Sequence, residues 1–460
     1  MGSLGAMPNL QRRLIDEGMS FENMFVTSPI CCPSRSSIFS GRYVHNHGAK
    51  NNREHCEHAH WQQYEEPVAF PVWMKKAGYK TFYAGKYLNR YGFSTTGGAK
   101  HIPKGWDWWN ALIGSSYYYN YPMSVNGTRI YHGNASEEDY LTNVIQKAAL
   151  TFLNESDSSS PIFMMLCPTA PHAPYTYLSK YKNSYNDKTV PRTPNWNHHS
   201  PDKNWLIRRT PATGMPQWLQ DQADRYYRNR WRSLLSVDDL ISNVINVLEQ
   251  KQILNETYVI FASDNGFHLG QFCMPVDKRL LYEFDVRVPL IVRGPKVPIS
   301  NRSEIVLNID LGPTILELAG QSVPARMDGH SFKSLLGPVN QSTWPRTKFL
   351  IEYWGQGSAD HKPAEKCPGT ESDDQCYYQY SCVCLDSTNN TYSCVRTITE
   401  QENSVYCEFM DDENFVEFYN LNADPYQMRN NADKLKSSEK LYYKKLLRNL
   451  KNCEGSRCTM

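Results

Sequence analysis

Five short segments carry the residues of this chain best suited to chemistry. They contain Cys31 and Arg35, Lys86, His172, Asp264 with Asn265, and Lys278. A cysteine can supply a nucleophile, lysine and arginine can neutralise an anionic group, and histidine can move a proton. The carboxylate and amide oxygens of Asp264 and Asn265 are hard ligands with no thiolate or histidine cluster beside them, so a metal there should be Ca²⁺ rather than zinc.

Each of these residues also has a plain structural interpretation. Lys86 or Lys278 alone is most often a solvated surface charge. His172 between two prolines is typical of a loop, and Asp-Asn-Gly is a favourable turn sequence. Cys31 and Cys32 could be a buried or disulfide-bonded pair. The joint appearance of these residues, several of them just after apolar runs, favours an active site.

Short apolar runs alternate with segments of helical spacing. The runs are residues 79–84, 161–167, 257–262 and 288–292, and the helical segments are 140–153, 231–254 and 311–319, the last with Asp310 as a possible N-cap. This order predicts an α/β fold with a large mixed, mostly parallel sheet flanked by helices. Ligands of such sheets bind at the carboxyl ends of the strands, where Lys86, His172 and Asp264 stand.

Composition places limits on the partners of the chain. Its 460 residues suffice for one large core plus an appendage. The formal net charge of +2 gives no general attraction to nucleic acid, and the longest apolar stretches are too short to span a membrane. We expect a globular protein with neither partner. The sequence does not fix the oligomeric state.

The pattern of apolar runs and loops in the sequence changes near residue 349. Aromatic and β-branched runs at 349–354, 404–410 and 415–421 are separated by polar, cysteine-rich loops, and a charged helical pattern covers 437–450. We therefore predict a catalytic domain at residues 1–345 and a smaller, cysteine-rich α+β subdomain at residues 346–460.

Cysteines and glycosylation sequons indicate the secretory route. Eight of the 13 cysteines fall in the last hundred residues: Cys367, Cys376, Cys382, Cys384, Cys394, Cys407, Cys453 and Cys458. They lack two clean C-x-x-C pairs, so disulfides are favoured over zinc, with the connectivity open. Seven N-x-Ser/Thr sequons predict glycosylation at Asn126, Asn134, Asn154, Asn255, Asn301, Asn340 and Asn389. The first 13 residues hold no signal-peptide core, so we expect the signal segment to be missing from this chain.

Cys31-Cys32-Pro33-Ser34-Arg35, followed by Ser40-Gly41-Arg42, resembles the C-x-P-S-R signature of the sulfatase family. The resemblance implies an alkaline phosphatase/sulfatase-like fold and oxidation of Cys31 to formylglycine by a formylglycine-generating enzyme. A hydrated aldehyde has two hydroxyls on one carbon. One can attack sulfur and form a sulfate ester, and the other can then lose its proton and expel sulfate. Without Cys31 the cysteine count becomes 12, an even number.

The same resemblance implies roles for the other segments. Catalytic residues would be Cys31, Arg35, Lys86, His172 and Lys278. Arg35 would stabilise the hydrated aldehyde, the two lysines would contact sulfate, and the histidine would lie near the leaving oxygen. Asp264 and Asn265 would bind Ca²⁺, which would also hold one hydroxyl of the residue made from Cys31.

Longer stretches resemble one branch of the family, which removes 6-O-sulfate from N-acetylglucosamine in heparan or keratan sulfate. They are residues 31–48, 79–91, 234–240, 263–295, 308–316 and 382–396. The resemblance implies a lysosomal exo-enzyme with a sulfated glycosaminoglycan substrate. One alternative is an extracellular endosulfatase, although we find no long basic insertion of that type. Cys31 disfavours a phosphatase or phosphodiesterase. A non-catalytic glycan-binding protein is favoured only by the lack of the family's metal-binding Asp-Asp pair.

Two departures from the family pattern remain. Leu88 stands where many members have histidine, and His45 and His47 are conceivable substitutes, although a structural role is equally plausible. The family also opens with a strand that ends in a metal-binding Asp-Asp pair. Asp16 and Glu17 lie in a helix-like stretch and do not match it. We therefore expect an N-terminally truncated chain that lacks this strand and pair and has very weak activity.

Overall fold

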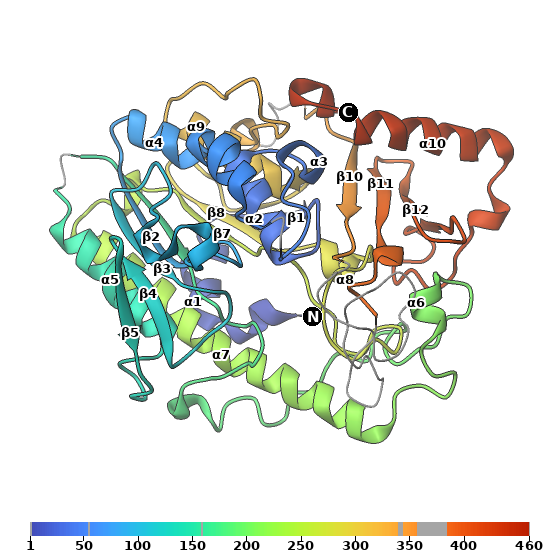
Figure 1. Ribbon diagram of the computed structural model, residues 1–460, viewed down its shortest axis with the longest axis horizontal. Coiled ribbons are helices and arrows are strands. Elements are labelled where there is room, and N and C mark those ends of the chain that lie inside the picture. The colour runs from blue at the N-terminus through green and yellow to red at the C-terminus, as the bar shows by residue number, and fades with distance from the viewer. Residues whose placement is uncertain (1, 54–55, 158–159, 339–343, 357–383, 460) are drawn as a thin grey trace.

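The structure is a computed structural model that describes residues 2–53, 56–157, 160–338, 344–356 and 384–459 (Figure 1). One sheet has the strand order β5-β4-β3-β2-β6. Its strands are β2 (Lys80–Lys86), β3 (Trp108–Leu112), β4 (Tyr121–Val125), β5 (Thr128–His132) and β6 (Ile162–Cys167). β2 pairs in parallel with both β3 and β6, whereas β4 is antiparallel to both of its neighbours.

A second sheet has the order β7-β8-β1-β9. Its strands are β1 (Met19–Phe25), β7 (Val259–Ala262), β8 (Leu290–Arg293) and β9 (Ser300–Leu307). Only β1 and β9 pair in parallel here. The predicted mixed, helix-flanked α/β fold is confirmed, but antiparallel pairs outnumber parallel ones in these two sheets. Short connections such as that between β4 and β5 permit antiparallel pairing without a helical crossover.

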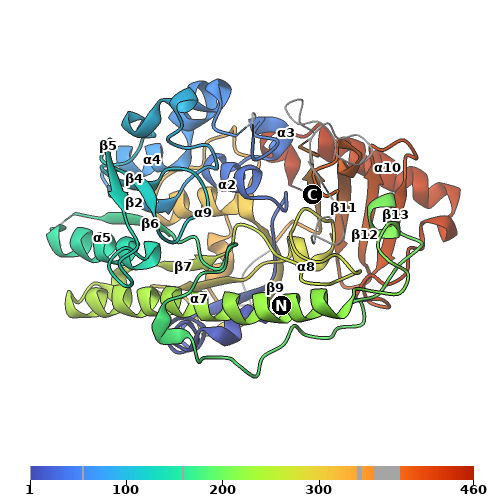
Figure 2. The ribbon, with the colours of Figure 1, turned by 60° about the horizontal axis from the view of Figure 1, so that its bottom comes forward.

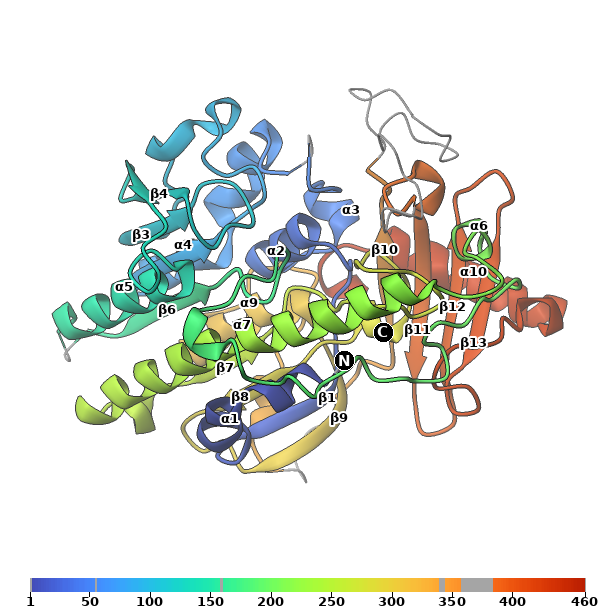
Figure 3. The same ribbon diagram turned by 90° about the horizontal axis from the view of Figure 1, so that it is seen from below.

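Helices cover both sheets. The longest, α7 (Gln217–Gln250), crosses the front of the molecule in Figure 3. The others are α1 (Pro8–Leu10), α2 (Cys31–Ser40), α3 (Val44–His47), α4 (Phe70–Lys76), α5 (Leu141–Glu155), α6 (Trp205–Arg208), α8 (Glu283–Val286), α9 (Leu311–Leu318) and α10 (Ser437–Lys451). Within the described residues no helix is long and apolar enough to cross a membrane. Asp310 precedes α9 without capping it, because its carboxylate instead binds Arg346 and accepts from Leu307 N.

A groove separates the two sheets. β6 pairs only with β2, and β7 pairs only with β8, among the described strands. Every residue of β6 and β7 is only half-buried, although both strands are almost wholly apolar. Both line one cavity of about 1450 Å³, whose walls also include apolar residues of α7 and α9. The two strands therefore present unpaired edges to a common apolar space.

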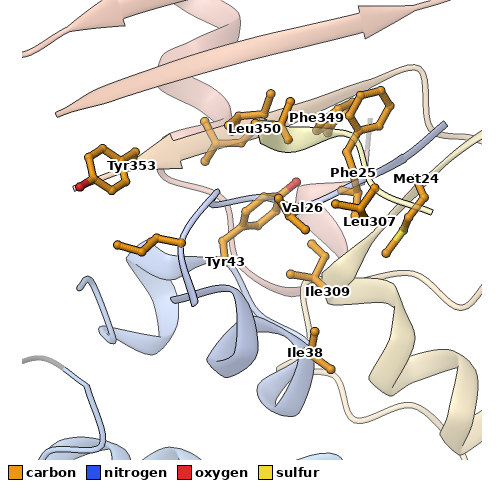
Figure 4. Close-up of a cluster of buried hydrophobic side chains, with 14 of the residues drawn as sticks. Met24, Phe25, Val26, Ile38, Tyr43, Leu307, Ile309, Phe349, Leu350 and Tyr353 are labelled. Atoms are coloured by element: carbon orange, nitrogen blue, oxygen red, sulfur yellow. The ribbon is translucent and has the colours of Figure 1, made fainter. Parts of the chain in front are cut away.

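The C-terminal part forms an antiparallel sheet beside the larger part (Figure 2). Its strands are β10 (Lys348–Tyr353), β11 (Tyr392–Ile398), β12 (Asn403–Phe409) and β13 (Val416–Asn420), with α10 alongside. One hydrophobic core runs through both parts: Phe25 packs on Phe349 with ring centroids 4.9 Å apart (Figure 4). The boundary at residues 345/346 stays a prediction.

Disulfides are present, as predicted. The described pairs are Cys32–Cys56, Cys394–Cys407 and Cys453–Cys458. Within the described chain Cys31, Cys167 and Cys273 form no disulfide, so the even count left without Cys31 does not mean that every other cysteine is disulfide-bonded. Cys367, Cys376 and Cys382 lie outside the described residues, as does Asn340. Five sequon asparagines are exposed and Asn389 is half-buried, and glycosylation stays a prediction.

Candidate active site

The fold brings six of the seven predicted catalytic and metal-binding residues to one cavity, and the buried Cys31 interacts with four of them. Cys31 is the first residue of α2, and Arg35 follows one turn later. Lys86 ends β2, His172 follows β6, and Asp264 and Asn265 follow β7. Lys278 comes from the long loop between β7 and β8. The cavity is lined by six of these residues: Arg35, Lys86, His172, Asp264, Asn265 and Lys278.

Cys31 lies buried and unbonded among positive charges. Burial by itself raises the pKa of its thiol, but the charges of Lys278 and Lys86, together with a hydrogen bond between Cys31 and His172, lower it by more. The result is a Cys31 pKa well below the usual range. An oxygen nucleophile or an anion placed here would be stabilised by the same cations.

Arg35 forms hydrogen bonds with residues at the ends of two strands, β2 and β7. Its Nε donates to Asp264 Oδ2 at 2.8 Å, and its Nη1 donates to Lys86 O at 2.7 Å. Burial would raise the pKa of Asp264, but Arg35, Lys86 and Lys278 outweigh it and hold the pKa at about 2. Asp264 is therefore ionised at every physiological pH. The described contacts make Arg35 a partner of this carboxylate, and its predicted role toward the aldehyde stays a prediction.

His172 sits with its Nε2 facing the cationic centre. Lys278 Nζ lies 3.4 Å from His172 Nε2, and His172 Nδ1 lies 2.8 Å from Ala173 O. The carbonyl can only accept, so Nδ1 carries a proton and Nε2 is the acceptor in the neutral ring. Burial, followed by the charge of Lys278, lowers the pKa of His172. A bound anion would offset that charge and favour protonation of Nε2.

Two residues that position His172 were not predicted. Tyr118 Oη donates to His172 O at 2.6 Å, and Arg230 Nη1 donates to Pro171 O at 3.0 Å. Arg230 is buried in α7, with its guanidinium 4.0 Å from the Phe267 ring centroid. The sequence held one usable signal, because Arg230 falls on the same helical face as the apolar Leu234 and Val237. A cation within a buried stripe requires a polar partner.

Asp264 and Asn265 are suited to a cation. Asn265 Nδ2 donates to Gly266 O at 2.7 Å, whereas its Oδ1 is buried without a hydrogen-bond partner among the described residues. A buried acceptor without a donor is costly, and a metal ion would satisfy it. Gly266 permits the turn, because a Cβ there would lie 2.2 Å from Phe284 O. Oxygens of Asp264 and Asn265 supply only part of the roughly six to eight that Ca²⁺ takes.

The conceivable histidine substitutes do not point at this site. His45 Nδ1 lies 2.9 Å from Glu352 Oε1, and its Nε2 lies 3.1 Å from Cys453 O. His47 is buried, with Nε2 3.0 Å from Ser37 Oγ and Nδ1 accepting from Ala49 N. Both have the structural role that the sequence left open, and Leu88 is part of the core.

Asp16 and Glu17 also lie apart from the site, as expected. Asp16 is exposed and accepts a hydrogen bond from Gln11 Nε2 at 2.7 Å. Glu17 faces Arg293 at 4.0 Å. Neither residue is among those that line the cavity.

Comparison with known proteins agrees with this geometry. The family model described as Sulfatase matches residues 2–321, well over half of the chain. The chain belongs to the sulfatase family. It is 45% identical to the N-acetylglucosamine-6-sulfatase of Capra hircus over 99% of this chain and 82% of that protein.

More distant proteins share part of this similarity. The extracellular sulfatase SULF-1 homolog of Drosophila melanogaster is 38% identical over 79% of this chain, but over only 33% of its own length. A structure solved in complex with its substrate D-glucosamine-2-N,6-O-disulfate superposes with a TM-score of 0.74. It has 23% identity and covers 96% of this chain and 92% of its own, so this likeness supports the fold. As a member of this family, the chain is a sulfuric ester hydrolase.

Proposed function

We propose that this sulfatase hydrolyses 6-O-sulfate esters of N-acetylglucosamine at the ends of heparan or keratan sulfate chains. The observation that carries the proposal is that Lys86, Lys278 and His172 line one cavity and all three interact with the buried Cys31. The 45% identity to an N-acetylglucosamine-6-sulfatase over nearly the whole chain supports the substrate class. Residence in the lysosome is part of the same proposal.

The side chains divide the work of sulfate ester cleavage. Lys86 and Lys278 are both buried, so they neutralise the non-bridging sulfate oxygens with little screening by water. His172 Nε2, between Lys278 and the cavity, gives its proton to the leaving sugar oxygen as the ester S–O bond breaks. Arg35 keeps Asp264 ionised and fixes the end of β2 that carries Lys86.

Residue 31 and a calcium ion complete the proposed chemistry. Formylglycine made from Cys31 supplies, as its hydrate, one hydroxyl to attack sulfur and a second to release sulfate. Asp264 and the orphan Oδ1 of Asn265 would hold Ca²⁺, which supplies positive charge to the sulfate oxygens. The oxidation requires the formylglycine-generating enzyme as a partner during maturation.

The metal site needs more oxygen ligands than these two residues provide. The groove between β6 and β7 ends at His172 and Asp264, and its two unpaired edges can each bond to a strand placed between them. We propose that one further extended segment occupies this groove and adds carboxylates next to Asp264. Without such a segment, we expect weak metal binding and very weak turnover.

The test combines a chemical and a functional measurement. Tandem mass spectrometry of the residue 31 peptide, from protein co-expressed with the formylglycine-generating enzyme, should show the aldehyde in place of the thiol. Binding of N-acetylglucosamine 6-sulfate, measured by calorimetry, should exceed that of N-acetylglucosamine and of its 3-sulfate. Cys273→Ser is the matched control, because this cysteine is also buried and outside any disulfide but packs in a separate cluster with Met215 and Leu219. An unmodified residue 31, or equal binding of all three sugars, would refute the proposal.

The second candidate is an endosulfatase, which the 38% identity to the Drosophila protein keeps open. An exo-enzyme releases sulfate only from the terminal residue, so the yield per chain is independent of oligosaccharide length. An endosulfatase releases more sulfate from a longer 6-O-sulfated oligosaccharide. Comparing tetrasaccharides with dodecasaccharides separates the two.

A further inference from the structure

Three metal-ligating side chains meet outside the residues assigned to catalysis. Glu57, Glu66 and His101 each offer one ligand atom, and these atoms lie within 4.8 Å of one another. Glu66 Oε2 is 3.0 Å from His101 Nε2. Glu57 follows the disulfide-bonded Cys56, Glu66 begins a short 3₁₀ helix (Glu66–Val68), and His101 follows another (Gly98–Lys100).

Glu57 lacks the partners that a buried carboxylate requires. Its side chain is fully buried, and neither carboxylate oxygen accepts a hydrogen bond from the described residues. The nearby Gln62 amide donates instead to Thr96 O at 2.9 Å. An ionised carboxylate in this position is very costly unless a cation or a proton neutralises it.

The two carboxylates of the cluster are not fully balanced by their neighbours. Burial, followed by the charge of Glu66, raises the pKa of Glu57 well above its usual range, and Gln62 and Arg90 lower it only in part. Burial and the same two carboxylates also raise the pKa of Tyr87. A cation bound between the carboxylates would offset their negative charges and so lower the pKa of both Glu57 and Tyr87.

We propose that Glu57, Glu66 and His101 bind one zinc ion as a structural site. Zinc accepts carboxylate oxygen and imidazole nitrogen as ligands, whereas Ca²⁺ prefers oxygen alone. Zinc ligands at roughly 2.0–2.2 Å stand about 3.3–3.6 Å apart in a tetrahedron. The 3.0 Å pair and the 4.8 Å limit bracket that spacing, so small side-chain shifts are sufficient. Water would take the fourth position.

The ion would hold the active-site helix in place through its neighbours. Cys56, next to Glu57, is bonded to Cys32, which follows Cys31 in α2. Cys32 N also donates to Asn52 Oδ1 at 2.9 Å. A zinc ion that joins Glu57 to Glu66 and His101 therefore pins the segment that carries this disulfide.

The test measures zinc in the full chain with Ca²⁺ in excess to occupy the other site. After dialysis, elemental analysis should find about one zinc per chain, and Glu57→Gln and His101→Gln should each lower the affinity by roughly tenfold or more. Added zinc should raise the Tm of the parent by several degrees but not that of either variant. Glu138→Gln, at an exposed position, is the matched control.

The main alternative is a metal-free site in which a protonated Glu57 donates a hydrogen bond to Glu66, and the zinc content of the parent separates it from the proposal. Because the glutamine amide replaces that donor without a charge, Glu57→Gln would then keep or raise the Tm in EDTA. Equal zinc content in the parent and both variants, or none in the parent, would overturn the proposal. Loss of zinc from Glu57→Gln with an unchanged Tm in EDTA would support it and exclude a folding defect.

Discussion

Replacing Asp264 by asparagine should expose the charge balance of the active site. This carboxylate accepts a hydrogen bond from Arg35 and lies among the charges of Arg35, Lys86 and Lys278. Asparagine has the same shape but no charge, so the three cations would repel one another without compensation. We expect Asp264→Asn to destabilise the fold as well as to remove a proposed metal ligand.

The size of the effect follows from the pKa of Asp264. A fall from 3.8 to about 2 corresponds to about 2 kcal/mol of folding free energy, at roughly 1.4 kcal/mol per pH unit. Because the folded-state pKa is depressed, this stability is fully present above pH 3.8 and is lost as the pH falls toward 2. The carboxylate is 23% exposed, so screening by solvent is limited.

The assay is urea unfolding followed by tryptophan fluorescence, with EDTA present so that no metal contributes. At pH 7, Asp264→Asn should lower the free energy of unfolding by about 2 kcal/mol. At pH 2.5 the difference between parent and variant should shrink to well under half of that value. Asp433→Asn, at an exposed position, is the control and should change little at either pH.

Two results would refute this reasoning. A difference that stays constant between pH 7 and pH 2.5 would mean that the lost contact is a hydrogen bond rather than a charge interaction. A variant as stable as the parent at pH 7 would mean that the cations do not depend on Asp264, and that other carboxylates balance them.

Three further predictions follow from the same geometry. Lys278→Met should lower kcat/KM by roughly 100-fold. It also removes a charge that lowers the pKa of His172, so the fall of activity with rising pH should move to higher pH. An unchanged pH profile would exclude His172 as the acid. Tyr118→Phe should lower kcat by roughly tenfold with little change in KM, because only the hydrogen bond to His172 O is lost; steady-state kinetics decide this. The β6 amides that face the groove should exchange hydrogen at least about 100-fold faster than those bonded to β2, and equal protection by mass spectrometry would show that the groove is closed.

Much of the fold could be predicted because its signals are local. The apolar runs at residues 161–167 and 257–262 became β6 and β7, and the helical spacing at 140–153 became α5. β1 was missed because its sequence, Met-Ser-Phe-Glu-Asn-Met-Phe, alternates too weakly to stand out, and its place between β8 and β9 depends on pairing across more than 250 residues. Strand order in a sheet is set by such distant contacts, which one sequence does not reveal.

The motif residues of the site could be predicted from the sequence, but the residues that position them could not. The motif around Cys31 and the order of Lys86, His172, Asp264 and Lys278 led to residues that do converge. The positioning groups could not be found in this way, because a tyrosine or arginine that supports a carbonyl, as Tyr118 and Arg230 do, carries no motif. Their role depends on which backbone carbonyls the fold brings next to them, and this is visible only in the coordinates.

The charges of the site set a condition for binding the proposed metal ion. Arg35, Lys86 and Lys278 bring three positive charges to Cys31, and within the described residues Asp264 is the carboxylate bound directly to one of them at the cavity. A metal ion added to this centre raises the positive charge further, so it can bind well only if more carboxylates enter with it. The apolar groove ends at Asp264 and provides the place for them. With these carboxylates present, the site keeps enough positive charge to bind a sulfate ester, and the repulsion among its cations does not unfold the protein.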